Sequence, residues 1–318
     1  MEETTQKMTV AEKISQITRN HLLKNNGLAL GQCLTAVGWV GGTIPHLSEK
    51  EGLVELSMAD VSGGGIAVGA ALAGRRPIYI VRYQGFQWYN AASIVNYAAK
   101  SKDMWGIPCP IFVRSIAMDG AIGPVASGSH HSIFIRMPGI VVCAPMTPNE
   151  YQQVWNYFME HDDPMYISEH KKSFPIDYDM KDIIKPKADV TIFAISSTRI
   201  NAIEAVKTLE GNGIVCNLIH LLWLKPFVIN KKIIASLNQS RFGGLILDGD
   251  FENGALKCLA FDIIQKLTGS GNKFKPIKTL GLEERSAGFA PHLDNLPPTT
   301  GKIVKTVEYI INSNGKKN

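Results

Sequence analysis

Short apolar runs alternate with helical patterns along most of the 318-residue chain. Strands as short and apolar as these runs are typical of parallel sheets that helices cover on both faces. The alternation of strands with helices therefore predicts an α/β fold with parallel sheets. The expected strands lie at 28–30, 77–83, 110–114, 139–144, 165–168, 190–196, 214–222 and 245–248.

Helical patterns lie between these runs, for example at 91–102, 148–161 and 199–210. The last of them has apolar residues at three-residue steps, which predicts one buried face. Those residues are Ile200, Ile203, Val206 and Leu209. The pattern ends at Gly211-Asn212-Gly213, which suits a C-terminal cap.

The best domain boundary lies between Lys171 and Lys187. There an apolar strand gives way to Lys, Asp and Pro without a clear period, and a new strand-helix-strand unit starts at Asp189. We therefore expect two domains, over residues 1–180 and 188–318, each with its own core.

Composition narrows the class of protein. Hydrophobic residues make up 45% and charged residues 19% of the chain, which fits a folded protein. The net charge of +5 is too small to indicate a nucleic-acid-binding surface. No apolar run reaches the roughly 18–20 residues of a membrane span, and the N-terminus does not resemble a secretion signal. Five scattered cysteines without a CxxC pair favour free thiols in a reducing compartment, so we expect a cytoplasmic protein without a metal site of its own.

The Gly-rich segment after Asp60 is not a nucleotide loop. A dinucleotide fingerprint would need a small residue at position 68, which is Val, and a phosphate loop would need a Gly-Lys-Ser/Thr ending. The pattern predicts a helix whose small face, with Gly65, Gly69 and Ala70, allows another helix to approach. Asp60 precedes this helix, where an N-cap or first-turn carboxylate and a functional carboxylate are both reasonable.

Two other clusters allow more than one interpretation. His130 and His131 follow a loop rich in small residues; they make a poor metal site, but one of them could transfer a proton at a catalytic edge or lie solvated on the surface. An aromatic cluster closes one strand and either packs in the core or lines a ligand crevice. Its members are Tyr83, Phe86, Trp88 and Tyr89.

An ordered set of segments covers nearly the whole chain. They are 28–31 with Gly38, Gly41 and Gly42; 56–72; Tyr83-Gln84-Gly85-Phe86, which lies 26 residues after Asp60; 96–100; 110–114; His131-Ser132; 138–142; and 163–165. The second half adds 189–195, Gly213-Ile214, Lys225-Pro226 and 245–248 with Gly254. In order and spacing the set resembles the β subunit of thiamine-dependent 2-oxo-acid dehydrogenases, whose two domains also form the C-terminal part of transketolase.

The resemblance implies a pyrimidine-binding domain, a transketolase C-terminal-like domain and roles for individual residues. Asp60 would be the carboxylate that hydrogen-bonds the aminopyrimidine ring of thiamine diphosphate and activates it. Phe86 would stack on that ring, with Tyr83 and Tyr89 in the same aromatic segment. His131 or His130 would lie near the reacting carbon and handle a proton or the substrate's carboxylate.

The chain departs from the family pattern at three places. The carboxylate is normally Glu, and Asp60 is shorter by one bond, about 1.5 Å. His220-Leu221-Leu222 replaces the usual Asp-Leu-Arg before the proline turn. The loop between His131 and Pro138 is shorter than the family's usual connection, so the rim of the site would be more open or completed by a partner.

The family's diphosphate-and-metal motif is missing, because Asp248-Gly249-Asp250 is not followed by an Asn pair. The resemblance then implies a separate α-type subunit that holds the diphosphate and Mg²⁺, an α2β2 heterotetramer, and the small-residue helix at a subunit contact. A lipoyl acyltransferase is a further candidate partner. Two alternatives stay open: the C-terminal subunit of a split transketolase-like ketol transferase, and a non-catalytic pairing subunit that lost activation through Asp60.

Overall fold

The protein is described by a computed structural model that covers residues 7–36 and 38–315. The chain divides into two compact units. Unit 1 runs to Met118 and resumes at Val125–Met180, and unit 2 consists of Asp119–Pro124 and Lys181–Asn318. Each unit is a parallel sheet with helices, which confirms the predicted α/β class.

The strands of unit 1 follow the order β2-β1-β3-β4-β6-β5, and each neighbouring pair is parallel. The strands are β1 Leu28–Gln32, β2 Leu53–Leu56, β3 Pro77–Val81, β4 Phe112–Ala117, β5 Val141–Cys143 and β6 Met165–His170. The α-helices are α1 Val10–Lys24, α2 Gly38–Gly42, α3 Asp60–Leu72, α4 Gln87–Ser93, α5 Ala99–Trp105, α6 Ser132–Ile135 and α7 Pro148–Glu160. Short 3₁₀ segments lie at Glu49–Glu51, Gln84–Phe86 and Lys171–Ser173.

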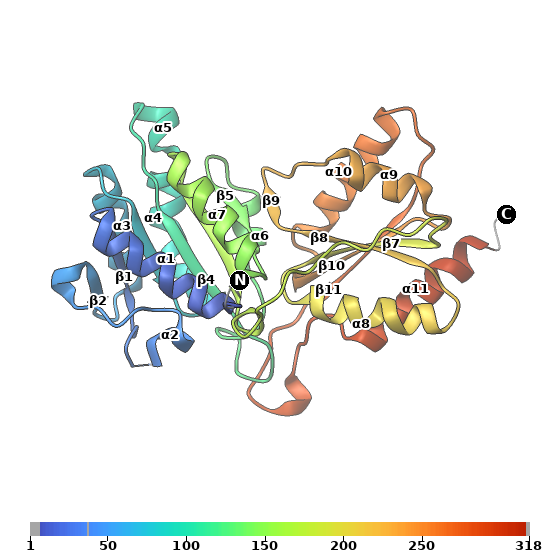
Figure 1. Cartoon of the computed structure of the whole chain (residues 1–318), viewed down its shortest axis with the longest axis horizontal. Helices are drawn as coiled ribbons and strands as arrows, with labels where there is room; N and C mark the ends of the chain where they lie inside the picture. Colours follow the sequence, from blue (N-terminus) through green and yellow to red (C-terminus); the bar gives the residue numbers. More distant parts are fainter. Residues whose placement is uncertain (1–6, 37, 316–318) are drawn as a thin grey trace, which may run out of the picture. The chain divides into compact units, whose positions relative to one another are not determined.

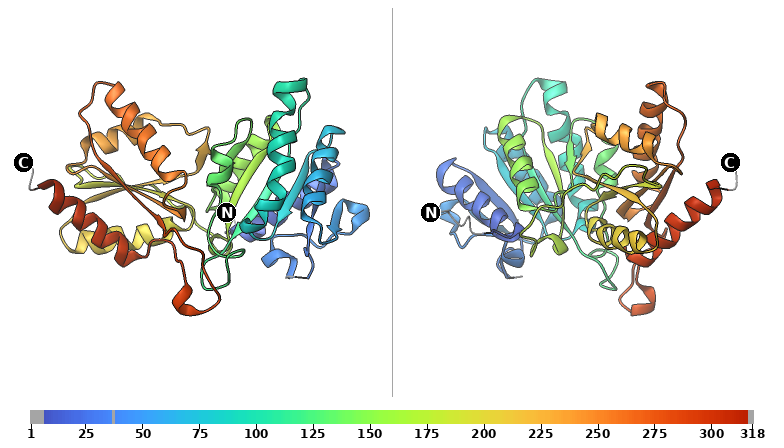
Figure 2. Two further views of the ribbon diagram at one scale, coloured as in Figure 1. Left: turned by 180° about the vertical axis from the view of Figure 1, so that it is seen from behind. Right: turned by 45° about the vertical axis from the view of Figure 1, so that its right-hand side comes forward.

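Unit 2 contains a parallel sheet in the order β11-β10-β7-β8. Its strands are β7 Val190–Ile195, β8 Cys216–Leu221, β10 Gly244–Phe251 and β11 Ile277–Leu282, with a short strand β9 at Trp223–Lys225. Its helices are α8 Thr198–Gly211, α9 Lys231–Gln239, α10 Leu256–Gly269 and α11 Thr300–Gly315, with a 3₁₀ turn at Pro291–Leu293. Figure 1 shows α9 and α10 on one face of this sheet and α8 and α11 on the other, and both views of Figure 2 show the same two layers.

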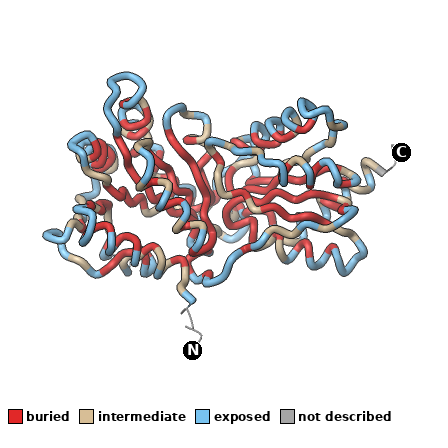
Figure 3. Tube along the Cα trace, turned by 45° about the horizontal axis from the view of Figure 1, so that its top comes forward, coloured by how far each residue is buried: buried red, intermediate tan, exposed pale blue. Residues whose placement is uncertain are grey.

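Most strands of both sheets are buried, whereas the outer faces of the helices are exposed (Figure 3). On α8 the buried face differs from the predicted one. Val206 and Leu209 are buried, but Ile200 and Ile203 are only half-buried, because a three-residue step drifts around a helix of 3.6 residues per turn. Ala202 and Ala205 fill the core instead.

Several predicted elements need correction. The sequence pattern missed β2, β9 and β11, which are short or partly exposed. The helix expected at 91–102 is three segments, because a π-helical turn at Ile94–Ala98 joins α4 to α5. Within residues 7–36 and 38–315, no helix combines the length and apolar character that a membrane span requires. Cys109, Cys143 and Cys216 are buried free thiols.

A buried ion pair ties the centre of unit 1 together. Arg114 on β4 donates to both carboxylate oxygens of Glu169 on β6, at 2.6 and 2.9 Å, and both side chains are 1% exposed. Tyr151 on α7 donates a further hydrogen bond to Glu169, at 2.5 Å. Arg114 also donates to Thr43 Oγ1, at 2.9 Å, which anchors the loop after β1. The pair therefore joins two strands, a helix and a loop.

Glu169→Gln should destabilise unit 1 strongly, because it leaves the buried Arg114 guanidinium without its counter-charge. We expect the free energy of unfolding to fall by about 3–5 kcal/mol, measured by urea unfolding followed by circular dichroism. Asp163→Asn is the control, since it breaks an ion pair with Lys102 in which the side chains are 33% and 54% exposed. It should cost less than about 1 kcal/mol. Equal losses for the two variants would contradict the role of the buried pair.

His220, which stands where the family has Asp, is half-buried in β8. Burial lowers its pKa to about 4, and the charge of Arg199 adds to this effect. Since the ordinary pKa of histidine is about 6.5, His220 stays neutral in the folded protein while the unfolded chain takes up a proton.

Stability should therefore fall as the pH drops from about 6.5 towards about 4, by on the order of 1–3 kcal/mol from this group. The His220→Asn variant should lose that part of the pH dependence. The measurement is urea unfolding at a series of pH values; identical slopes for wild type and variant would show that His220 does not titrate in this way.

Candidate functional site

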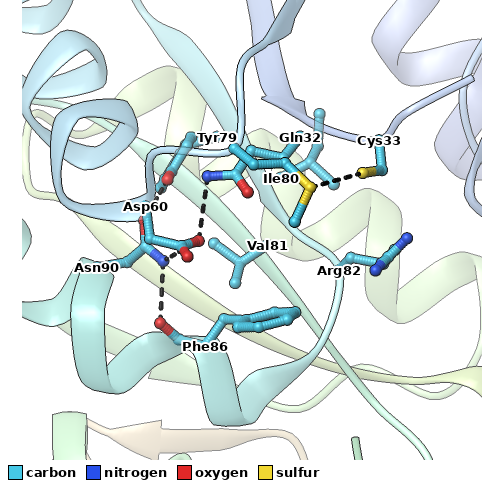
Figure 4. A pocket seen from close by; sticks show the side chains of 10 residues that line it. Gln32, Cys33, Asp60, Tyr79, Ile80, Val81, Arg82, Phe86 and Asn90 are labelled. Atoms are coloured by element: carbon cyan, nitrogen blue, oxygen red, sulfur yellow. Dashed lines mark hydrogen bonds between the residues drawn. The ribbon is translucent and has the colours of Figure 1, made fainter. Parts of the chain in front are cut away.

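A hollow of about 340 Å³ lies where β1 and β3 end and α3 begins. In a parallel sheet the carboxyl ends of strands share one edge, which is where ligand crevices form. Gln32 ends β1, Asp60 is the first residue of α3, and Asn90 lies on α4. Figure 4 shows the lining residues: Gln32, Cys33, Met58, Asp60, Tyr79, Ile80, Val81, Arg82, Phe86 and Asn90.

Two amides hold one oxygen of the Asp60 carboxylate. Gln32 Nε2 donates to Asp60 Oδ1 at 3.1 Å, and Asn90 Nδ2 donates to the same oxygen at 3.2 Å (Figure 4). No described residue donates a hydrogen bond to Asp60 Oδ2. Asp60 is not the N-cap, because Ala59 holds that position and no side chain caps the helix, but Asp60 is the acidic residue of the first helical turn. The half-buried carboxylate can therefore accept a hydrogen bond from a ligand.

Tyr79 and Asn90 extend this hydrogen-bond network into the core. The buried Tyr79 hydroxyl donates to Asn90 Oδ1, and Asn90 Nδ2 also donates to the Phe86 carbonyl at 2.9 Å. Burial raises the pKa of Tyr79, and the charge of Asp60 raises it further, so the phenol keeps its proton and acts as a donor. With its oxygen engaged by Tyr79, the Asn90 amide must present its nitrogen to Asp60.

The small residues of α3 give these side chains room, but not on the expected face. A Cβ added at Gly63 would lie 2.8 Å from the Tyr79 hydroxyl oxygen, and one at Gly64 would lie 3.3 Å from the Asn90 carbonyl oxygen. Gly65 and Gly69 are instead exposed, and a Cβ at Gly69 would meet nothing within 4 Å. Inside the unit, Gly64 thus lies against α4 and Gly63 lies against Tyr79 of β3, while the role of the exposed face with Gly65 and Gly69 at a subunit contact stays a prediction.

The three aromatic residues predicted to bind the cofactor line different hollows in the structure. Phe86 lines the hollow with Asp60. Tyr83 lines a second hollow, although its ring centroid is only 5.9 Å from that of Phe86. Tyr89 is 59% exposed and lines a shallow depression beside Asp60 with Ala59, Val61 and Ser62. Phe86 and Tyr89 thus each line a hollow that Asp60 also lines, whereas Tyr83 does not.

His130 and His131 are both buried, so neither is a solvated surface residue. Gln84 links them: the His130 backbone N–H donates to Gln84 Oε1 at 2.7 Å, and Gln84 Nε2 donates to Ser168 Oγ at 2.9 Å. His131 Nδ1 lies 3.0 Å from the same hydroxyl. Neither histidine lines the Asp60 hollow, and their proposed roles in the reaction stay predictions.

Sequence reasoning did not identify Gln32, Tyr79 or Asn90 as parts of the site. A usable signal existed for Gln32, since a polar side chain directly after a short apolar strand lies at the carboxyl edge of the sheet. Asn90 gave no such signal, because only the packing of α4 on α3 brings it to Asp60. The described residues contain no group of three or more His, Cys, Asp or Glu placed to bind a metal ion.

Asn90→Ala should cost about 1–3 kcal/mol of unfolding free energy, because it leaves the buried Tyr79 hydroxyl without its acceptor. In a Tyr79→Phe background the same change should cost less, since the stranded hydroxyl is gone. Asn96→Ala is the control, because this exposed residue is only two turns further along and bonds Lys100. Urea unfolding of the single and double variants measures the coupling; strictly additive losses would contradict it.

Two domain families match the chain. Residues 41–176 match the transketolase pyrimidine binding domain, and residues 181–249 match the transketolase C-terminal domain. The pyruvate dehydrogenase E1 component subunit beta of Rickettsia felis is 25% identical over 275 residues, covering 81% of this chain and 83% of that protein. The 2-oxoisovalerate dehydrogenase subunit beta of Bacillus subtilis is 25% identical over 224 residues, covering 65% and 67%.

Solved structures show the same fold. A split-gene transketolase, described as an inactive beta4 tetramer, has a TM-score of 0.73 at 16% identity and covers 96% of this chain and 100% of that chain. A transketolase from Pichia stipitis has a TM-score of 0.68 at 17% identity and covers 94% and 46%. The chain therefore belongs to the families of the transketolase pyrimidine binding domain and the transketolase C-terminal domain, which together span most of it, and its curated relatives include β subunits of 2-oxo-acid dehydrogenases.

Proposed function

We propose that this chain is the β-type subunit of a thiamine-diphosphate-dependent enzyme that cleaves the bond next to a 2-oxo-acid carbonyl. The cofactor would lie at an interface with an α-type subunit. One observation carries the proposal: two amides hold Asp60 Oδ1, while Oδ2 accepts no hydrogen bond from the described residues in a hollow that Phe86 also lines.

The lining of the hollow fits the aminopyrimidine ring. A carboxylate oxygen can accept a hydrogen bond from a ring nitrogen that carries a proton. The Phe86 ring offers an aromatic face, and Ile80 and Val81 supply apolar contact for a flat heterocycle. Asp60 and Phe86 would hold the ring, with Tyr83 and Tyr89 next to this pair in the chain.

Bound thiamine diphosphate supplies a nucleophilic carbon and an electron sink for this class of cleavage. Asp60 would present a hydrogen-bond acceptor that is fixed in direction. Gln32 and Asn90 would hold the carboxylate in place, and the neutral Tyr79 would orient the Asn90 amide. His131 or His130 would bind the substrate's carboxylate or transfer a proton.

Asp60 replaces the family's usual Glu, and the two amide donors bear on this difference. The Gln32 and Asn90 amides donate to Asp60 Oδ1 and so limit the directions in which Asp60 Oδ2 can point. A carboxylate held in this way is poised for one ligand contact, which favours a catalytic subunit over a non-catalytic pairing subunit.

A second chain would complete the site. This chain lacks the family's diphosphate-and-metal motif, so Mg²⁺ and the diphosphate would be held by the α-type subunit. Several large apolar side chains beside the Asp60 hollow are exposed and would suit a subunit contact in an α2β2 heterotetramer. They include Met58, Val61, Ile66, Trp88 and Tyr89. A lipoyl acyltransferase would be a suitable acceptor of the acyl group.

The test is to copurify the chain with its α-type subunit and measure thiamine-diphosphate binding and turnover of 2-oxo acids. Asp60→Asn should lower turnover by roughly 100- to 10,000-fold, because it removes the acceptor charge. Asp60→Glu should lower turnover by on the order of 100-fold, since the longer side chain shifts the carboxylate from Gln32 and Asn90 by about 1.5 Å.

Asp103→Asn, an exposed carboxylate on α5, is the control and should match wild type. Turnover by Asp60→Asn at the wild-type rate would contradict the role of Asp60. Activity on ketose phosphates in place of 2-oxo acids would favour the ketol-transferase alternative, and cofactor binding with turnover by this chain alone would contradict the shared site.

A further inference from the structure

A second hollow of about 330 Å³ lies at the same edge of the unit 1 sheet, and two cations line it. Arg82 follows β3, Met118 follows β4, and Lys171 follows β6, so three neighbouring parallel strands end at this hollow. The lining residues are Val40, Gly41, Arg82, Tyr83, Ile116, Met118, Lys171 and Phe174. Arg82 also lines the Asp60 hollow, and Figure 4 shows its side chain turned away from Asp60.

Neither cation has an anionic partner in the part of the chain that the structure describes. Among residues 7–36 and 38–315, no carboxylate forms an ion pair or hydrogen bond with the Arg82 guanidinium or the Lys171 ammonium group. Arg82 instead lies over the ring of Tyr83, with 4.9 Å between the guanidinium carbon and the ring centroid. This cation–π contact holds Arg82 at the hollow without neutralising its charge.

The wall opposite these charges is apolar and anchored. Val40, Ile116 and Phe174 are buried. Val40 lies in α2, and Thr43 Oγ1 donates to the Val40 carbonyl at 2.8 Å and accepts from Arg114. Gly41 has φ +68°, and a Cβ there would lie 3.2 Å from the Phe174 ring, so a side chain would narrow the hollow. The buried Arg114–Glu169 pair thus supports this wall.

We propose that this hollow binds a small organic acid, whose carboxylate pairs with Arg82 and Lys171 while its hydrocarbon body packs on Val40, Ile116 and Phe174. Apart from the two cations, the side chains of the lining carry one polar group, the Tyr83 hydroxyl. A sugar phosphate would leave most of its hydroxyls unpaired there, which is costly. Arg82 lines this hollow and also the Asp60 hollow, so the bound acid belongs to the substrate class of the reaction at the Asp60 hollow. This last step rests on the proposed function.

The test measures binding to the full-length chain by isothermal titration calorimetry, without cofactor and without turnover. The probes are pyruvate, 2-oxobutanoate, 2-oxohexanoate and fructose 6-phosphate. Affinity should rise about fourfold for each added methylene group, and fructose 6-phosphate should bind most weakly. Arg82→Gln and Lys171→Gln should each weaken 2-oxohexanoate binding about 10- to 100-fold, while Arg82→Lys should lose less than Arg82→Gln.

Lys24→Gln and Lys50→Gln are the matched controls, because both lysines are exposed in unit 1 away from the hollow. They should bind 2-oxohexanoate as wild type does. Circular dichroism and the thermal midpoint show that each variant is folded; if Arg82→Gln is not, Lys171→Gln and Arg82→Lys carry the test.

The site is refuted if folded Lys171→Gln and Arg82→Gln bind as tightly as wild type, if affinity is independent of chain length, or if fructose 6-phosphate binds most tightly. These results do not depend on the proposed function. If acid binding requires both Arg82 and Lys171, but the complex with the α-type subunit does not bind thiamine diphosphate, the acid site is supported and the proposed function is rejected. If turnover depends on the cofactor, but neither Arg82→Gln nor Lys171→Gln changes acid binding, the proposed function is supported and the acid site is rejected.

Discussion

Parallel pairing of β1, β3, β4 and β6 determines where the chemistry of unit 1 can lie, because it brings the carboxyl ends of four strands to one edge. The buried Arg114–Glu169 pair secures this arrangement across β4 and β6. Through Thr43 the same guanidinium holds the loop after β1, and through Tyr151 the same carboxylate holds α7. A charge pair that costs much to bury thus joins elements that carry the second hollow, which Arg82 and Lys171 line.

The Asp60 network explains how a shorter carboxylate can hold a defined position. Its two donors come from different elements, Gln32 at the end of β1 and Asn90 on α4. Asn90 can serve only because Tyr79 occupies its oxygen, and Tyr79 fits only because Gly63 has no side chain. The small residues of α3 therefore belong to the same arrangement as the carboxylate, and not only to helix packing.

Arg82 connects the two hollows of unit 1. One contains a carboxylate with a free acceptor oxygen, and the other contains two cations beside an apolar wall. In the proposed function, the first hollow would take the cofactor ring and the second the organic acid, at the same sheet edge. The opposite charges of the two hollows would then favour a different ligand in each.

The amino-acid sequence by itself determined the α/β class, the location of most strands along the chain and the choice of Asp60 and Phe86, which line one hollow, because apolar periodicity and motif spacing are local properties of the chain. It did not determine that Gln32 and Asn90 hold Asp60, that His130 and His131 are buried around Gln84, or that Arg82 and Lys171 share a hollow. Lys171 is 89 residues from Arg82, and only the pairing of β3 with β4 and of β4 with β6 brings them together. Contacts of this kind depend on strand order and helix packing, which no local pattern records.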